Sequence, residues 1–372
     1  MIRLLAEQSG GPCRGSRYLP DRHCSGDGNV GRRNMIVVMK PDSSKKHVEH
    51  VINLLDGMGL SSCLIESAEP KVVEVLGIAG SFDNTGLENA PMVDKVLPEA
   101  GPILAASRRP GEETLLVPLG GRATVGGSKL AVIAGPCSVE SRAQLLEIAA
   151  AVRDAGAVAL RGGAFKPRTS PYSFQGHGEK ALEWLALARE ETGLAVVTEV
   201  LSSAHVELVA RYADVLQVGS RNMHHTPLLR AVGQQERPVL LKRGWSATLE
   251  EFLLAAEYVM VEGNHHVILC ERGIRTHETY VRNTLALAVV PEIKRVSRLP
   301  IIVDPSHGTG RNHLVTPMSD AAVACGADGL IIEVHGRPAE AWSDGEQSLD
   351  LGQFRLLMQG LRPFAAASGR EG

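Results

Sequence analysis

Residues 130–160 read LAVIAGPCSVESRAQLLEIAAAVRDAGAVAL and contain one complete strand–helix–strand repeat. The segments 130–134 and 157–160 are short apolar runs next to glycine or proline, a pattern typical of buried strands. Between them, residues 140–155 carry apolar side chains at helical spacing, and Ser138 and Ser141 stand at the start of this segment as helix-capping residues do. The stretch therefore predicts a strand, an amphipathic helix and a second strand in succession.

The same alternation continues through most of the remaining chain. Further apolar strands are predicted at 195–198, 214–218, 238–241, 267–270, 300–303 and 329–333, with helices between them, for example at 248–262, 279–298 and 316–325. Eight such units between Thr114 and Phe364 match the length of a (β/α)8 TIM barrel, so this α/β fold is expected over residues 108–364. A glycine-rich hairpin at 115–127 is expected to cap the barrel. A doubly wound parallel sheet is the alternative.

A smaller α+β domain is predicted before the barrel. Strands at 35–40, 60–66, 72–78 and 102–106 and helices after Asp42 and near 87–96 give the order β-α-β-β-α-β of a ferredoxin-like domain, expected over residues 35–107. Residues 107–113, SRRPGEE, are polar and contain Pro-Gly, which is typical of a linker. Residues 1–34 are rich in arginine and glycine without an apolar period, so they are expected to form a disordered N-terminal extension.

The composition limits the classes of partner. The chain has 372 residues, and 39 Lys and Arg against 42 Asp and Glu give a net charge of −3, so no summed positive field draws it to nucleic acid or to a membrane surface. With 44% hydrophobic but only 4% aromatic residues, the core must rest on aliphatic side chains, which favours an α/β fold. The six cysteines form no CxxC pair and no export signal is recognisable, so a reduced, cytoplasmic protein is expected.

Polar or ionisable residues follow every predicted barrel strand. Because the carboxyl ends of barrel strands meet at one face, where the active sites of TIM barrels lie, these side chains are candidates for one site. In strand order they are Cys137; Arg161, Lys166 and Arg168; Glu199; Gln217 and Arg221; Lys242 and Arg243; Glu271 and Arg272; Asp304 and His307; and Glu333, His335 and Asp344.

A thiol, an imidazole and two carboxylates come from the ends of the first, seventh and eighth strands, which are neighbours around a closed barrel. Taken singly, Cys137 is consistent with a buried filler and Glu333 with a surface carboxylate. Taken together, Cys137, His307, Glu333 and Asp344 suit a divalent transition metal, Mn, Fe, Co or Zn rather than Ca or Mg.

The basic residues suggest an anionic substrate. Arg161, Lys166, Arg168, Arg221, Lys242 and Arg272 converge on one rim of a slightly acidic protein, and such a cluster repels itself unless an anion compensates it. The alternative is a set of solvated surface cations. Residues 166–170, KPRTS, add hydroxyl donors and a stiffening Pro167, so this segment is expected to form a phosphate cradle, although it is not a Walker loop.

Five segments carry a family resemblance: AGPCSVE at 134–140, LRGGAFKPRTSP at 160–171, VLLKRG at 239–244, ILCERG at 268–273 and VDPSHG at 303–308. From about Met35 to Pro363 the chain resembles the type Iβ family of 3-deoxy-D-arabino-heptulosonate 7-phosphate (DAHP) synthases, the transferases of the first step of the shikimate pathway to aromatic amino acids. The related 3-deoxy-D-manno-octulosonate 8-phosphate synthases differ in the cradle, where KPRTS is the form found in DAHP synthases.

The resemblance implies a set of roles. It implies a divalent metal, Mn²⁺ first and otherwise Fe²⁺, Co²⁺ or Zn²⁺, held by Cys137, His307, Glu333 and Asp344. It implies phosphoenolpyruvate on Arg161, Lys166, Arg221, Lys242 and Arg272, and erythrose 4-phosphate on Arg168 and Thr169. Glu199, Lys166 and His307 are the expected catalytic residues. The segments MHHT at 223–226 and Gly336-Arg337 depart from the family pattern close to the site.

The resemblance also implies a regulatory role for the small domain, with feedback by Tyr or Phe, and a homo-oligomer, a tetramer or a dimer. Three alternatives stay open at the level of the sequence. The first is a Schiff-base aldolase with Lys166 or Lys242 as nucleophile. The second is a non-catalytic amino-acid-sensing barrel, and the third is an octulosonate 8-phosphate synthase that uses arabinose 5-phosphate.

Overall fold

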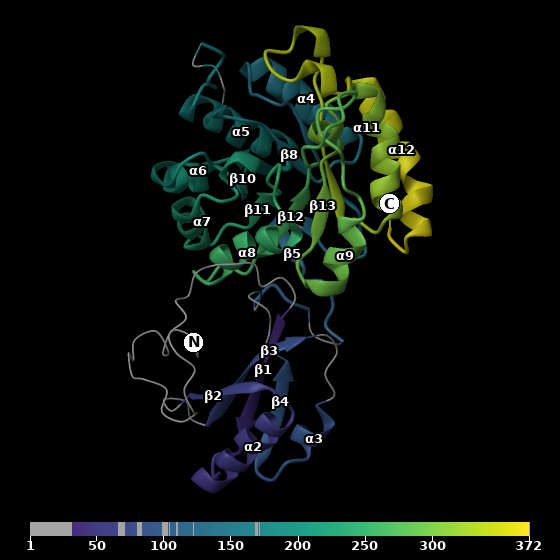
Figure 1. Cartoon of the computed structure of the whole chain (residues 1–372). Helices are drawn as coiled ribbons and strands as arrows, with labels where there is room; N and C mark the ends of the chain where they lie inside the picture. Colours follow the sequence, from purple (N-terminus) through teal and green to yellow (C-terminus); the bar gives the residue numbers. More distant parts are fainter. Residues whose placement is uncertain are drawn as a thin grey trace. The chain divides into compact units, whose positions relative to one another are not determined.

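The computed structural model describes residues 32–65, 71–79, 84–98, 103, 105–108, 111–121, 123–167, 170 and 172–371. The chain divides into two compact units, Met1–Leu104 and Ala105–Gly372 (Figure 1). The expected disordered extension, apart from residues 32–34, lies outside the described residues. No helix among the described residues is long and apolar enough to cross a membrane.

The N-terminal unit has the ferredoxin-like arrangement that the sequence predicts. Its elements are β1 (Arg32–Met39), α2 (Lys45–Gly57), β2 (Ser61–Ile65), β3 (Val72–Ala79), α3 (Thr85–Glu88) and β4 (Val93–Pro98). Within the described part of this unit the strands form one antiparallel sheet in the order β2-β3-β1-β4. Val51 and Leu55 of α2 share a buried cluster with Val37 of β1 and Val73 of β3. The helix thus covers one face of the sheet with aliphatic side chains.

The second half of this unit differs from the prediction. The expected helix near 87–96 ends at Glu88, and the last strand in the described part of this unit is β4 at Val93–Pro98. Of the strand expected at 102–106, residues 102 and 104 lie outside the described residues, and 103, 105 and 106 are not in a strand. Met92 has a positive φ of 64°, which no helix accommodates. From there Val93 and Val96 are buried, and β4 pairs with β1. Pairing with β1 therefore determines that this segment forms a strand, because its local sequence pattern fits either a helix or a strand.

The second unit is a closed (β/α)8 barrel. Among the described residues, its eight parallel strands are β7 (Ala131–Gly135), β8 (Ala159–Arg161), β9 (Ala195–Glu199), β10 (Val215–Val218), β11 (Val239–Lys242), β12 (Val267–Glu271), β13 (Ile301–Val303) and β14 (Gly329–Glu333). The α-helices are α4 (Arg142–Asp154), α5 (Glu179–Thr192), α6 (Val206–Tyr212), α7 (Thr226–Gly233), α8 (Leu249–Met260), α9 (Val289–Val296), α10 (Pro305–Thr309), α11 (Asn312–Ala324) and α12 (Leu351–Ala367).

A hairpin closes the amino ends of the barrel strands, as the sequence predicts. It consists of β5 (Val117–Gly120) and β6 (Ala123–Val125). Val117, Leu119 and Val125 belong to the same buried cluster as the first residues of four strands, Ala131, Ala159, Ala195 and Val215. Because this end is filled by aliphatic side chains, only the carboxyl ends of the strands are left to form a site.

Two segments of this unit differ from the prediction. Of the expected helix 279–298, only Val289–Val296 is helical, and residues 279–288 belong to a long loop after β12. The expected linker at 107–113 is attached to the barrel where the structure describes it. The backbone nitrogen of Arg108 donates to the Val296 carbonyl at 2.9 Å, and that of Ala106 donates to Glu257 Oε1 at 2.7 Å. The polar, Pro-Gly-containing composition predicts a linker but does not show what its residues and their neighbours bind.

Candidate active site

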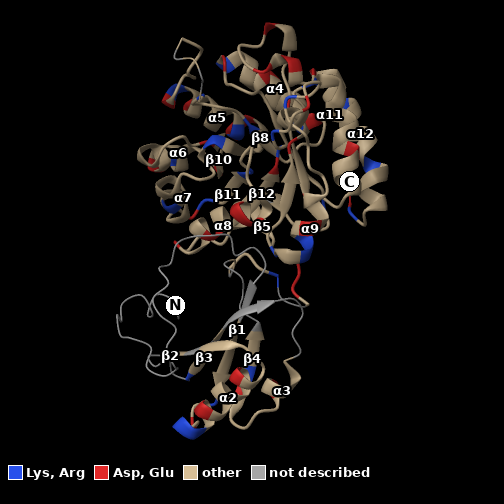
Figure 2. Ribbon diagram, viewed as in Figure 1, with Lys and Arg blue, Asp and Glu red and all other residues tan. Residues whose placement is uncertain are grey.

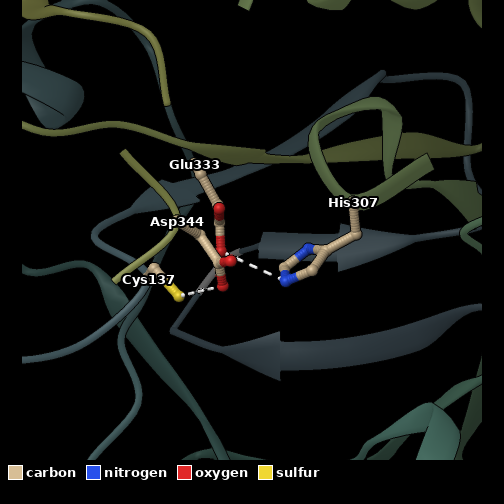
Figure 3. Close-up of side chains that lie close together, drawn as sticks. All are labelled: Cys137, His307, Glu333 and Asp344. Carbon is tan, nitrogen blue, oxygen red and sulfur yellow. Dashed lines mark hydrogen bonds and ion pairs between the residues drawn. The ribbon is translucent and has the colours of Figure 1, made fainter. Parts of the chain in front are cut away.

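Four potential metal ligands meet at the carboxyl ends of β7, β13 and β14. Cys137 follows β7, His307 lies in α10 directly after β13, Glu333 is the last residue of β14, and Asp344 lies in the loop beyond. One ligand atom of each residue lies within 4.8 Å of the others (Figure 3). The four side chains singled out in the sequence therefore form one cluster, although they are up to 207 residues apart in the chain.

The four side chains already contact one another in pairs. The Cys137 thiol donates to Asp344 Oδ2 at 3.1 Å, and His307 Nε2 lies 3.3 Å from Glu333 Oε1 (Figure 3). The donor set of one sulfur, one nitrogen and two carboxylate oxygens suits a transition metal of the Mn to Zn series, whereas Ca²⁺ takes six or more oxygens. The cluster fits such an ion in number and kind of donor.

Burial and neighbouring charges set the protonation of the cluster. Burial, with a further contribution from Glu333, raises the pKa of the Cys137 thiol to about 12. Burial also lowers the pKa of His307 below its usual 6.5, against the opposing effect of Asp304. Burial would raise the pKa of Glu333, but His307 and Arg161 keep it below its usual value. Near neutral pH the cluster thus contains a protonated thiol, a neutral imidazole and a Glu333 carboxylate.

A buried carboxylate behind the cluster orients the imidazole. Asp304 Oδ2 lies 2.8 Å from His307 Nδ1, and its Oδ1 accepts the His307 backbone N–H at 2.9 Å. Lys242 Nζ donates to the same Asp304 Oδ2 at 2.5 Å. With a proton on Nδ1 directed at Asp304, the lone pair of Nε2 faces the other three side chains. A carboxylate in this position is a common support of a metal-bound histidine.

A cavity of about 340 Å³ opens beside this cluster and contains five of the six basic residues of the predicted rim, and the sixth, Arg168, lies outside the described residues. Figure 2 shows Lys and Arg segments beside β8 and β10. The described residues that line the cavity include the cations Arg161, Lys166, Arg221, Lys242, Arg272 and Arg282, together with Glu199, His307 and Asp344. Three of these six cations pair with carboxylates, Arg161 with Glu333, Lys242 with Asp304 and Arg282 with Asp344. The cavity is therefore rich in cations, and Lys166, Arg221 and Arg272 have no ion-pair partner among the described residues.

Several of these cations lack an internal counter-charge. Arg272 is 3% exposed, and within the described residues neither it nor Arg221 has a carboxylate at ion-pair distance. Burial lowers the pKa of Arg272, because removing its guanidinium from water disfavours the charged form. The Nε of Arg161, also buried, has no hydrogen-bond partner among the described residues. An anionic ligand would satisfy all three groups.

Lys166 and Glu199 also face this cavity. Lys166 Nζ lies 3.0 Å from Cys137 Sγ and from the Cys137 carbonyl oxygen, so its ammonium group is next to the cluster. A side chain at Gly163 would contact Lys166 Cδ at 2.8 Å, and one at Gly219 would contact Glu199 Oε1 at 2.0 Å. Glycine at these two positions gives the lysine and the carboxylate the space to enter the cavity.

Only part of the expected phosphate cradle can be placed. Lys166, Pro167 and Ser170 lie in the cavity wall. Arg168 and Thr169, the two residues expected to hold erythrose 4-phosphate, lie outside the described residues. Their roles therefore stay predictions.

The structure adds residues that sequence reasoning missed. Trp245 lies in the cavity wall, and the guanidinium carbons of Arg221 and Arg275 are 5.1 Å and 4.7 Å from its ring centroid. Arg282 lines the cavity from the loop where a helix was expected, and buried Gln347 contacts Glu333. Trp245 lies three residues after the end of β11, so the rule that strand ends carry site residues could have identified it. Arg282 and Gln347 carry no such signal.

The fold and the site together define a class of protein. A closed (β/α)8 barrel with a cationic cavity and a thiol, imidazole and carboxylate cluster at the carboxyl ends of its strands is a barrel enzyme. The family follows from sequence comparison. Residues 117–362 match the DAHP synthetase I family, and residues 35–98 match the DAHP synthase ferredoxin-like domain. The chain belongs to the DAHP synthetase I family.

Individual relatives carry two names, that of the DAHP synthase at higher identity and that of the octulosonate aldolase at lower identity. A phospho-2-dehydro-3-deoxyheptonate aldolase of Thermotoga maritima is 45% identical over 335 residues, which are 90% of this chain and 99% of the relative. A crystal structure of the DAHP synthase from the same organism has a TM-score of 0.73, with 44% identity, over 91% of this chain and 99% of that chain. A 2-dehydro-3-deoxyphosphooctonate aldolase of Nitrobacter winogradskyi is 33% identical and covers 64% of this chain and 88% of its own length.

Proposed function

We propose that the chain condenses phosphoenolpyruvate with D-erythrose 4-phosphate and water to give 3-deoxy-D-arabino-heptulosonate 7-phosphate and inorganic phosphate. The observation that carries this proposal is the position of His307 and Asp344, two of the four cluster residues, in the wall of the cationic cavity. A metal-type cluster and a cation-rich cavity share one space, which suits a metal-assisted reaction between two phosphorylated substrates.

In this reaction the basic residues bind and orient phosphoenolpyruvate. Arg221 and Arg272, which lack carboxylate partners among the described residues, and Lys242 are assigned to its phosphate and carboxylate oxygens. Arg161 contributes its unsatisfied Nε while its Nη1 stays on Glu333 at 2.6 Å. Arg168 and Thr169 are assigned to the phosphate of erythrose 4-phosphate on the strength of the family motif.

Cys137, His307, Glu333 and Asp344 are assigned to a divalent metal ion, with Mn²⁺ as the first choice and Fe²⁺, Co²⁺ or Zn²⁺ as alternatives. Such an ion supplies Lewis acidity toward the aldehyde oxygen of erythrose 4-phosphate. The enol carbon C3 of phosphoenolpyruvate forms the new bond to this aldehyde carbon, which leaves positive character at C2. Water adds at C2, and cleavage of the C–O bond then expels phosphate.

Protons move through groups that line the cavity. Lys166 lies beside the cluster and transfers a proton to the aldehyde oxygen as the new bond forms. His307 directs its ring proton at Asp304 and serves as a metal ligand. Glu199 places a carboxylate in the cavity that stabilises positive charge at C2 or orients the attacking water.

The test is the disappearance of phosphoenolpyruvate with erythrose 4-phosphate or with arabinose 5-phosphate, each with and without EDTA. We expect consumption with erythrose 4-phosphate only, abolished by EDTA and restored by Mn²⁺. Consumption with arabinose 5-phosphate instead would assign the octulosonate reaction, and no consumption with either would favour a sensing barrel. Activity that survives EDTA together with covalent trapping by borohydride would favour Lys166 or Lys242 as a Schiff-base nucleophile.

Arg272→Met and Arg295→Met form a matched pair for the cavity. Arg272 is buried in the cavity wall, whereas Arg295 pairs with Glu292 on the exposed side of α9. We expect a large rise in KM for phosphoenolpyruvate in the first variant and none in the second. Equal KM values would refute the assignment of Arg272.

For the ferredoxin-like unit we propose regulation by an aromatic amino acid, Tyr or Phe, in a homo-oligomer, a dimer or a tetramer. The support is the match of residues 35–98 to the DAHP synthase ferredoxin-like domain, whose described part contains no cluster of metal-type ligands. Titration calorimetry with each amino acid tests the effector, and sedimentation tests the assembly. We place the enzyme in the cytoplasm, where a thiol ligand such as Cys137 stays reduced.

A further inference from the structure

Arg282 is held in place at the rim of the cavity although it lies in a long loop. The loop after β12 is closed by Ile274 and Thr284, whose backbone groups exchange hydrogen bonds of 3.0 Å and 2.9 Å. The backbone nitrogen of Arg282 also donates to the Thr309 carbonyl at 2.8 Å. A side chain at Gly310, where φ is 70°, would lie 2.5 Å from Arg282 Cβ. The backbone of Arg282 is therefore fixed before any ligand binds.

The side chain of Arg282 connects two of the four cluster residues. Its Nη1 donates to Asp344 Oδ1 at 3.1 Å and to Gln347 Oε1 at 3.0 Å. Gln347 is 2% exposed, and its Nε2 donates to Glu333 Oε2 at 2.6 Å. We call Arg282 and Gln347 with these three hydrogen bonds the carboxylate clamp.

The clamp occupies one oxygen of each carboxylate and leaves the other oxygen to the cluster. Asp344 Oδ2 accepts from Cys137, while its Oδ1 is held by the clamp. Glu333 Oε1 faces His307 Nε2 and also accepts from Arg161 Nη1 at 2.6 Å, while its Oε2 is held by the clamp. Asp344 needs such support because it lies in a loop, at a positive φ of 50°. Without the clamp the Asp344 carboxylate could rotate about its terminal torsion, which is broad in proteins. The Glu333 carboxylate would keep only the contact of its Oε1 with Arg161.

We propose that Arg282 and Gln347 are positioning residues that hold Glu333 and Asp344 so that each offers one oxygen to a metal ion. This inference rests on the proposed metal site. Neither residue needs to touch the ion or a substrate for this role. The clamp also joins two loops of the site. The loop after β12 begins with Arg272 of the cavity wall and carries Arg282, and the loop after β14 carries Asp344 and Gln347. The hydrogen bonds of the clamp thus connect the cation-rich part of the site to the metal-type cluster.

The experiment is a calorimetric titration of Mn²⁺ into the substrate-free full chain and its variants. Loss of a hydrogen-bond partner behind a metal ligand typically costs 10- to 100-fold in affinity, so we expect Arg282→Met and Gln347→Met each to raise the Kd about 10-fold. Arg295→Met is the matched control, because it removes an exposed arginine–glutamate pair of α9 that does not line the cavity, and it should bind as the wild type does. Circular dichroism verifies that each variant is folded.

The double variant Arg282→Met/Gln347→Met tests whether the two residues act together as one clamp or independently of each other. If the two residues act through one hydrogen-bond chain, the double variant should bind about as weakly as the weaker single variant. A Kd raised about 100-fold would overturn the clamp as a unit. Arg282→Lys adds a rescue readout, since one ammonium group restores the contact with Asp344 and should recover part of the affinity.

Failure of the clamp and failure of the metal site give different results. If the wild type binds Mn²⁺, Cys137→Ala binds it more weakly and both clamp variants bind like the wild type, only the clamp is refuted. If the wild type binds no divalent ion of the Mn to Zn series, the proposed metal site is refuted, and the clamp with it.

Discussion

Metal binding should release one proton, and this number follows from the protonation of the four cluster residues. The pKa of Cys137 is raised to about 12, so the thiol carries its proton at neutral pH, but only the thiolate binds a metal. The pKa of His307 is lowered below 6.5, so the imidazole is already neutral at pH 7.5, and the lowered pKa values of Glu333 and Asp344 keep both carboxylates ionised. Only Cys137 has a proton to lose.

The magnitude follows from this stoichiometry. Below a pKa of about 12, each unit of rising pH increases the thiolate fraction about tenfold, which is about 1.4 kcal/mol of binding free energy. The Kd for Mn²⁺ should therefore fall about tenfold between about pH 6.5 and 7.5. Affinity rises with pH because the ion competes with a proton for the sulfur.

Calorimetry in buffers of different ionisation enthalpy measures the released protons directly. We expect a slope of about one proton for the wild type, and weaker, nearly pH-independent binding without proton release for Cys137→Ala. Tight binding by the wild type with no released proton and a flat Kd would show either that the thiol is not a ligand or that it is ionised before the metal binds.

Three further outcomes are expected. Asp304→Asn should raise the Kd for Mn²⁺ about 10- to 100-fold in the same calorimetry, because the charged acceptor of His307 Nδ1 is lost. Trp245→Leu should raise the KM for phosphoenolpyruvate about threefold at nearly constant kcat, because it removes the ring over Arg221, a contact of about 0.5–1 kcal/mol; an unchanged KM would contradict this. Phe252→Ala, at a fully buried position, should lower the free energy of unfolding by about 3–5 kcal/mol in urea, and fluorescence follows the barrel because Trp184, Trp245 and Trp342 all lie in that unit.

The barrel could be predicted because its strands are buried on both faces. Each strand must then be a short apolar run, which is visible without knowledge of its neighbours, and the observed bounds of all eight lie within two residues of the predicted ones. The cluster could be predicted for a related reason. In a closed barrel, chain order determines which strand ends are adjacent, so residues after the first, seventh and eighth strands must meet.

Other features depend on partners that are distant in sequence. The segment Val93–Pro98 forms the strand β4 because it pairs with β1. Residues 105–108 lie against the barrel because Glu257 and the Val296 carbonyl accept hydrogen bonds from their backbone N–H groups. Arg282 was expected in a helix, since its neighbours have helical periodicity. It is instead held in a loop by Ile274, Thr284 and Thr309, and no local pattern encodes such contacts.

The sequence by itself determined the class of fold, the order of the strands and the kinds of side chain at each strand end, because burial and chain order are encoded locally. Only the tertiary structure decided which carboxylate oxygen faces the cluster, that Asp304 lies behind His307, and that Arg282 and Gln347 connect Glu333 to Asp344. These are directional contacts of about 3 Å between loops far apart in sequence, and their geometry exists only once the barrel has closed.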